Sequence, residues 1–198
     1  LACALFQSVS YVCSAGFMLR YKSSLRLVIF SQLVMGAFCL PFAPFLFPPQ
    51  LLECLPEFIL WVIAWIGCFT VGQIGFFTTL RSIEASRMSS LLGLKILVLA
   101  MICVLFAGTP LSGLQWFAVL LSTVAAVGMN WSGGAHFTRK GLFWLLVTLV
   151  AYSLTDMVET RLVLLPKSGN IIRDSFAIGT VCYAVLGILK SFHNHLDC

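Results

Sequence analysis

The sequence predicts an all-α polytopic membrane protein with about seven transmembrane helices, and three observations lead to this fold class. The 198 residues are 60% hydrophobic and 10% charged, whereas a soluble domain usually carries about 25% charged residues. The mean hydropathy is +1.02. Apolar stretches of about twenty residues, long enough for a helix to cross a bilayer core of about 30 Å, recur along the chain.

The predicted spans follow one another with short connections that carry helix-ending residues. PFAPFLFPPQ follows the second span, AGTPLSG the fourth, SGGAHFTRKG the fifth and LLPKSGN the sixth. Proline and glycine are tolerated there because the backbone is leaving the hydrocarbon region. The first span lacks a basic leader and a small-residue cleavage site, so we expect it to be a membrane span and not a signal peptide. In order, the spans are residues 1–19, 25–46, 58–80, 88–107, 114–131, 141–162 and 172–189.

Basic residues gather in the connections on one side of the predicted bundle. The connections after spans one, three and five carry Arg20, Lys22, Arg26, Arg81, Arg87, Arg139 and Lys140. The connections after spans two and four carry no Lys or Arg, only Glu53 and Glu57. The positive-inside rule therefore places the N-terminus outside, although Arg161, Lys167 and Arg173 weaken the pattern. The net charge of +5 flanks the membrane, and we expect no nucleic-acid binding.

One lysine stands inside an apolar run. Residues 89–108 read SSLLGLKILVLAMICVLFAG, and Lys95 lies about 11 Å along the helix from Met88. A lysine near the middle of a membrane helix costs about 2.5–3.5 kcal/mol on insertion scales. We expect Lys95 to face a bundle interior or a water-filled cavity, and snorkelling to the headgroups is the alternative.

Other polar side chains inside the predicted spans are expected to face the same kind of interior. Asp156 lies about 22 Å along its helix from Gly141, so its depth differs from that of Lys95 by about 10 Å. A direct ion pair is therefore not expected: the two charges line one pathway at different levels, or Asp156 reaches the far interface. The polar set is Gln7, Tyr11, Gln73, Lys95, Tyr152, Thr155 and Asp156.

Small residues recur on one face of two spans and predict close helix packing, since helix backbones in lipid approach through such stripes. The third span carries Ala64, Cys68, Gly72 and Gly75, and the fifth carries Ala118, Ser122 and Ala126.

The remaining motifs argue against metal, cofactor and enzyme chemistry. The eight cysteines form no C-x-x-C pair and lie mostly in apolar runs, where cysteine behaves as a small hydrophobic residue. His193, His195 and Cys198 are a weak metal candidate, and we predict no metal site and no cofactor. The chain has no H-E-x-x-H or G-x-S-x-G motif, so we predict that it is not an enzyme.

Two segments predict an internal repeat. SYVCSAGFMLR and AYSLTDMVETR place Tyr and Arg at the same separation, Tyr11 to Arg20 and Tyr152 to Arg161. We therefore predict a five-helix first repeat over residues 1–134 and the first two helices of a second over residues 139–198. An odd number of helices per copy makes the copies inverted, a common transporter plan with substrate sites near the midplane.

The stretch TLRSIEASRMSSLLGLKILVLAMICVLFAGTPLSGLQWFAVLLSTVAAVGMNWSGG resembles the last part of an EamA repeat from the drug/metabolite transporter superfamily. The resemblance lies in a third helix ending in Leu80-Arg81, a small polar link, an apolar fourth helix, and a Gly/Pro turn before Leu114-Gln115-Trp116 and a small-residue fifth helix. SYVCSAGFMLR is similar to that family's first helix. The similarity covers essentially the whole chain, as one full repeat plus two helices.

This resemblance implies a ten-helix inverted-repeat transporter that moves small metabolites by alternating access, of which this chain is a fragment. The cavity would draw on the first, third, fourth and sixth helices. The candidate substrate-binding residues are Gln7, Tyr11, Gln73, Lys95, Tyr152 and Asp156.

Three features depart from the family pattern. Lys95-Ile96 stands where members often have a proline, and Gly108-Thr109-Pro110 replaces a common Gly-Glu turn. Ten-helix members are generally described with a cytoplasmic N-terminus, against the charge pattern.

We therefore expect an integral membrane transporter in the cell membrane, surrounded by the lipid bilayer. Lys95 favours an anionic or zwitterionic substrate such as an amino acid or organic acid, with a proton as candidate coupling ion. The alternative is a seven-helix receptor or sensor, which the very short connections and the repeat disfavour.

Overall fold

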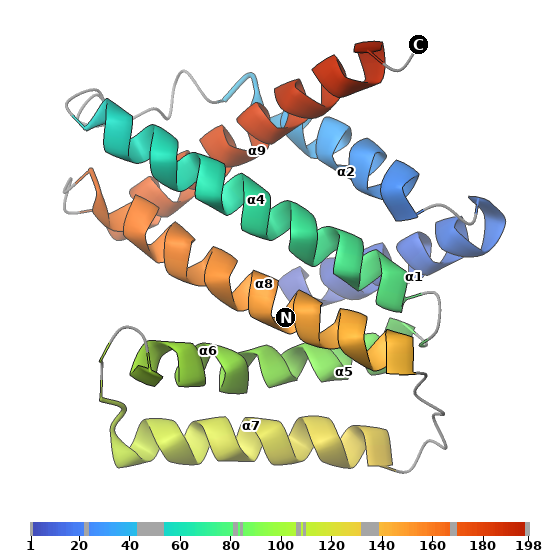
Figure 1. The fold of residues 1–198 in the computed structure, drawn as a ribbon, viewed down its shortest axis with the longest axis vertical. Coiled ribbons are helices and arrows are strands. Elements are labelled where there is room, and N and C mark those ends of the chain that lie inside the picture. The colour runs from blue at the N-terminus through green and yellow to red at the C-terminus, as the bar shows by residue number, and fades with distance from the viewer. Residues whose placement is uncertain are drawn as a thin grey trace. The chain divides into compact units, whose positions relative to one another are not determined.

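The computed structural model describes residues 2–21, 24–42, 54–80, 83, 85–105, 108, 110–131, 139–166 and 170–196. Within these residues every regular element is a helix, as Figure 1 shows. The elements are α1 (Ala2–Tyr21), α2 (Ser24–Cys39), α4 (Leu55–Thr79), α5 (Ala85–Leu91), the 3₁₀ helix η2 (Leu92–Leu94), α6 (Lys95–Leu105), α7 (Gly113–Trp131), α8 (Arg139–Leu164) and α9 (Ile171–Leu196).

The helices support the predicted all-α membrane class. Each predicted span overlaps a helix, and four described stretches are long and apolar enough to cross a membrane: Leu55–Thr79, Arg87–Leu105, Arg139–Leu164 and Ile171–Ile188. Arg26–Cys39 and Gly113–Met129 are shorter apolar helices. The protein is thus membrane-embedded, while the number of seven crossings and the inverted repeat stay predictions.

Local sequence explains where helices begin. Ser112 and Gln115 form a reciprocal capping box before α7: the Gln115 N–H donates to Ser112 Oγ (3.4 Å) and the Ser112 N–H to Gln115 Oε1 (2.8 Å). The Arg173 N–H donates to Asn170 Oδ1 (3.1 Å) at the start of α9. In the connection between α6 and α7, Gly108 has φ 61°, a conformation that glycine adopts without strain.

The chain divides into two compact units that interleave in the sequence. Unit 1 comprises Leu1–Leu27 and Val71–Leu154, and unit 2 comprises Val28–Thr70 and Thr155–Cys198. The divisions fall within α2, α4 and α8. The predicted repeats over residues 1–134 and 139–198 stay a prediction.

In unit 1, glycines of α4 lie directly against α8. A Cβ atom on Gly72 would lie 2.7 Å from the Tyr152 ring, and one on Gly75 would lie 2.5 Å from Thr148 Oγ1. The two helices therefore contact at Gly72 and Gly75, the last two small residues of the stripe predicted for the third span. Segments α5, η2 and α6 also pack beside α7 in this unit (Figure 1).

Buried hydroxyls in unit 1 are satisfied by their own helices. Thr79 Oγ1 donates to the Gly75 carbonyl (2.9 Å) and Thr148 Oγ1 to the Trp144 carbonyl (2.7 Å). This four-residue back-bonding provides a polar group with a partner where water is absent.

In unit 2, α2 and α9 cross at two facing glycines. A Cβ on Gly36 would lie 2.6 Å from the Gly187 Cα, and one on Gly187 would lie 2.7 Å from the Gly36 Cα. Near this crossing Gln32 is 1% exposed, and its Oε1 has no hydrogen-bond partner among the described residues. Trp65, Phe69 and Tyr183 form an aromatic cluster, with ring centroids 4.7 to 5.7 Å apart.

The glycine crossing generates a stability prediction. Replacing Gly36→Ala should lower the free energy of unfolding by about 1–3 kcal/mol, because the added methyl overpacks the backbone of Gly187. Thermal unfolding in detergent micelles measures this. The matched control is Gly67→Ala in α4, where no atom lies within 4 Å of the new Cβ. That change should be neutral or stabilising by up to about 1 kcal/mol, since alanine favours a helix. Equal melting temperatures for the two variants would contradict close packing of Gly36 against the Gly187 backbone.

Candidate functional site

Lys95 is the first residue of α6 and follows directly after the 3₁₀ segment Leu92–Leu94. Its side chain is half-buried. The Lys95 carbonyl accepts a hydrogen bond from Ser153 Oγ of α8 (3.3 Å), and the same hydroxyl lies 2.8 Å from the Leu149 carbonyl. The backbone at the predicted intramembrane lysine is therefore tied to α8 within unit 1.

The same part of unit 1 holds two further predicted residues. Tyr152 precedes Ser153 in α8, is half-buried, and its ring lies against Gly72 of α4. Gln73, the neighbour of Gly72, is also half-buried. The structure thus brings together the segments of α4, α6 and α8 that carry Gln73, Lys95 and Tyr152.

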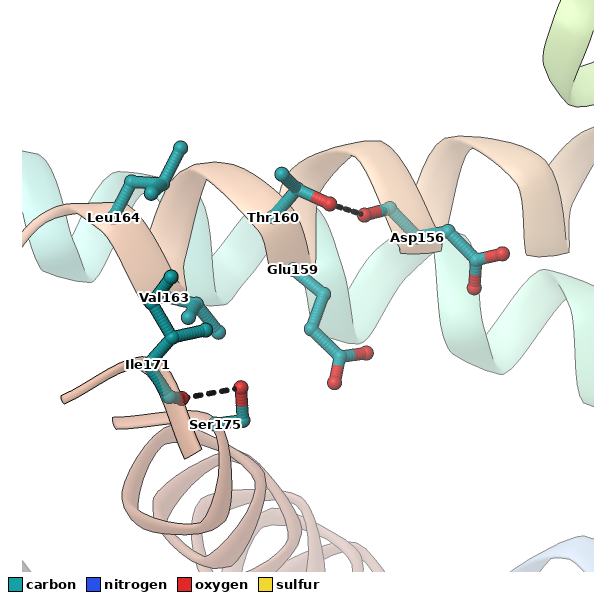
Figure 2. A pocket seen from close by; sticks show the side chains of 7 residues that line it. All are labelled: Asp156, Glu159, Thr160, Val163, Leu164, Ile171 and Ser175. Carbon is teal, nitrogen blue, oxygen red and sulfur yellow. Dashed lines mark hydrogen bonds between the residues drawn. The ribbon is translucent and has the colours of Figure 1, made fainter. Parts of the chain in front are cut away.

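Unit 2 contains a pocket with two carboxylates. Its volume is about 490 Å³, and it is lined by Asp156, Glu159, Thr160, Val163, Leu164, Ile171 and Ser175. Figure 2 shows the carboxylates of Asp156 and Glu159 on the same side of α8, with Ile171 and Ser175 contributed by α9. None of these lining residues is basic.

The hydroxyls of this pocket add acceptors to it. Thr160 Oγ1 donates its proton to the Asp156 carbonyl (2.8 Å), and Ser175 Oγ donates to the Ile171 carbonyl (2.8 Å), as Figure 2 shows. Each hydroxyl has one proton and two lone pairs, so both oxygens keep lone pairs to offer. The pocket therefore suits a group that carries hydrogen-bond donors or a positive charge.

Sequence reasoning missed Glu159. Its Oε2 accepts a hydrogen bond from Trp65 Nε1 of α4 (3.4 Å), and Trp65 is only 2% exposed. A buried indole N–H usually requires such a partner. The spacing of Asp156 and Glu159, three residues apart on one helix face, is the signal that could have found this acid.

A smaller pocket in unit 2 has balanced charges. It measures about 320 Å³ and is lined by Cys54, Glu57, Trp61, Arg161, Leu164 and Leu165. Trp61 Nε1 lies 3.5 Å from Glu57 Oε1. Because it holds one acid and one base, it has less preference for a charged ligand than the acidic pocket does.

The other predicted residues are placed as follows. Gln7 and Tyr11 belong to α1, but their side chains lie outside the described residues. Asp156 is half-buried in α8 and belongs to unit 2, whereas Lys95 belongs to unit 1. The described residues include no group of three His, Cys, Asp or Glu that could hold a metal ion. The side chains of His193, His195 and Cys198 fall outside that part of the chain.

Comparison with known proteins returned nothing: no family model, curated protein or solved structure matches this chain. The EamA resemblance therefore rests on the motifs of this sequence alone.

The acidic pocket generates a labelling prediction. A water-soluble carbodiimide with a small amine should modify Asp156 and Glu159, because both line an open pocket. Mass spectrometry of digested protein measures the labelled fraction at each site. Exposed Glu57 is the positive control, and Asp174, which is 3% exposed, should stay unmodified. Labelling of Glu57 without either pocket acid would contradict an open pocket.

Proposed function

We propose that this protein is a membrane transporter of small polar metabolites that works by alternating access. The observation that carries the proposal is Lys95, a half-buried cation within the apolar stretch Arg87–Leu105. An ionisable group in such a helix is expensive and normally marks a substrate or ion pathway. Asp156 and Glu159, on another apolar helix, support the same interpretation.

The chemistry of Lys95 favours a substrate that carries a carboxylate, such as an amino acid or an organic acid. Taken by itself, the acidic pocket of unit 2 offers acceptors for an ammonium group. We propose a proton as the coupling ion, because ionisable groups on apolar helices commonly mark proton pathways. The EamA resemblance supports two inverted five-helix repeats and a place in the cell membrane, and both are part of this proposal.

The lysine is tested by uptake into proteoliposomes. Lys95→Gln should raise the KM for a labelled amino acid or organic acid about tenfold or more, because it removes a charge-assisted hydrogen bond to the substrate carboxylate. Lys140→Gln is the matched control, since Lys140 is exposed near the start of α8. Unchanged uptake by Lys95→Gln would overturn the proposal. Saturable binding without uptake would instead favour a receptor.

The acidic pocket is tested by substrate class. The double variant Asp156→Asn, Glu159→Gln should weaken binding of an amino acid about tenfold or more, because the ammonium loses its charged acceptors. Binding of a carboxylate without an ammonium group should change little. Competition against one labelled substrate measures both affinities, and Glu57→Gln controls for loss of an acid elsewhere. An equal loss for both ligand classes would contradict ammonium recognition by this pocket.

A further inference from the structure

The stretch Arg87–Leu105 is apolar and long enough to span a membrane, yet it is not one regular α-helix. Three residues, Leu92–Leu94, form a 3₁₀ turn between α5 and α6. A 3₁₀ turn rises about 2.0 Å per residue, against 1.5 Å in an α-helix, and its hydrogen bonds have poorer geometry. The sequence predicted one uninterrupted helix over residues 88–107. The 3₁₀ turn is visible only in the structure.

Gly93 in the middle of this turn is not required for space. A Cβ at Gly93 would lie 3.7 Å from the Ala126 Cβ, an ordinary van der Waals contact. By contrast, a Cβ atom added at Gly36, Gly72 or Gly75 would lie less than 3 Å from its nearest neighbouring atom. Gly93 therefore acts by weakening the helical backbone at this position, because glycine is among the weakest helix formers.

The Ser153 hydroxyl of α8 contacts a backbone carbonyl of a second helix, α6. Its Oγ lies within hydrogen-bond distance of the Leu149 carbonyl in its own helix and of the Lys95 carbonyl in α6. Ser31, for comparison, donates to the Val28 carbonyl within α2. The single proton of the Ser153 hydroxyl is shared between these two carbonyls, and the hydroxyl thus links the first residue after the 3₁₀ turn to the neighbouring helix.

We infer that Leu92–Leu94 is a hinge in this span, and that Ser153 is a positioning residue that holds α6 in the observed arrangement. Bending at the turn changes the direction of α6 relative to α5. Lys95 is the first residue beyond the turn, so the hinge sets where its ammonium group points. The hinge is a property of the fold, and only its part in transport rests on the proposed function.

Hydrogen exchange in lipid nanodiscs, followed by mass spectrometry over peptides covering residues 92–99, tests the hinge without transport. Ser153→Ala should accelerate exchange in this segment about 2- to 10-fold, because it removes one hydrogen bond. Gly93→Ala should slow it about 3- to 5-fold, because alanine stabilises the helical backbone. Ser31→Ala, which removes a hydroxyl bonded within its own helix, should leave the segment unchanged.

Unchanged exchange in both variants, or equal acceleration by Ser31→Ala, would overturn the hinge. Uptake assays on the same variants test its role, and Gly93→Ala should slow transport while keeping substrate affinity. If Lys95→Gln transports normally, the proposed function fails and the exchange result still decides the hinge. Altered exchange with normal transport in both hinge variants would overturn its role in the transport cycle.

Discussion

Close approach of helix backbones is the constraint on which the rest of the structure depends. Helices in lipid gain no hydrophobic free energy by burying apolar side chains against one another, so their contacts rely on van der Waals packing and hydrogen bonds. Gly36 and Gly187 in unit 2, and Gly72 and Gly75 in unit 1, remove the side chains that would keep the helices apart. The Tyr152 ring and the Thr148 hydroxyl reach α4 only because those glycines leave room.

The same apolar surroundings govern every polar group. Where no water is available, a hydroxyl needs a partner, and Thr79 and Thr148 find it four residues back in their own helices. Ser153 extends this pattern to a second helix and meets the carbonyl of Lys95. A hydrogen bond from a helix hydroxyl to a backbone carbonyl therefore lies beside Lys95, the residue on which the proposed function depends.

Charge is distributed unequally between the two units. Unit 1 contains the half-buried Lys95, and unit 2 contains the pocket with Asp156 and Glu159. Glu159 also accepts a hydrogen bond from the Trp65 N–H, so this bond connects the pocket wall to the aromatic cluster.

The sequence by itself determined the class of the protein and the positions of its helices, because the length and apolarity of a run are local properties. It also identified the Gly72 and Gly75 face, since small residues spaced three and four apart along a helix in lipid favour close packing against another helix. Only the tertiary structure decided that Ser153 contacts the Lys95 backbone and that α9 contributes Ile171 and Ser175 to the open pocket that holds Asp156 and Glu159. Those contacts depend on how each helix is rotated about its axis relative to its neighbour. Helices that are apolar on nearly every face lack the amphipathic pattern from which that rotation could be predicted.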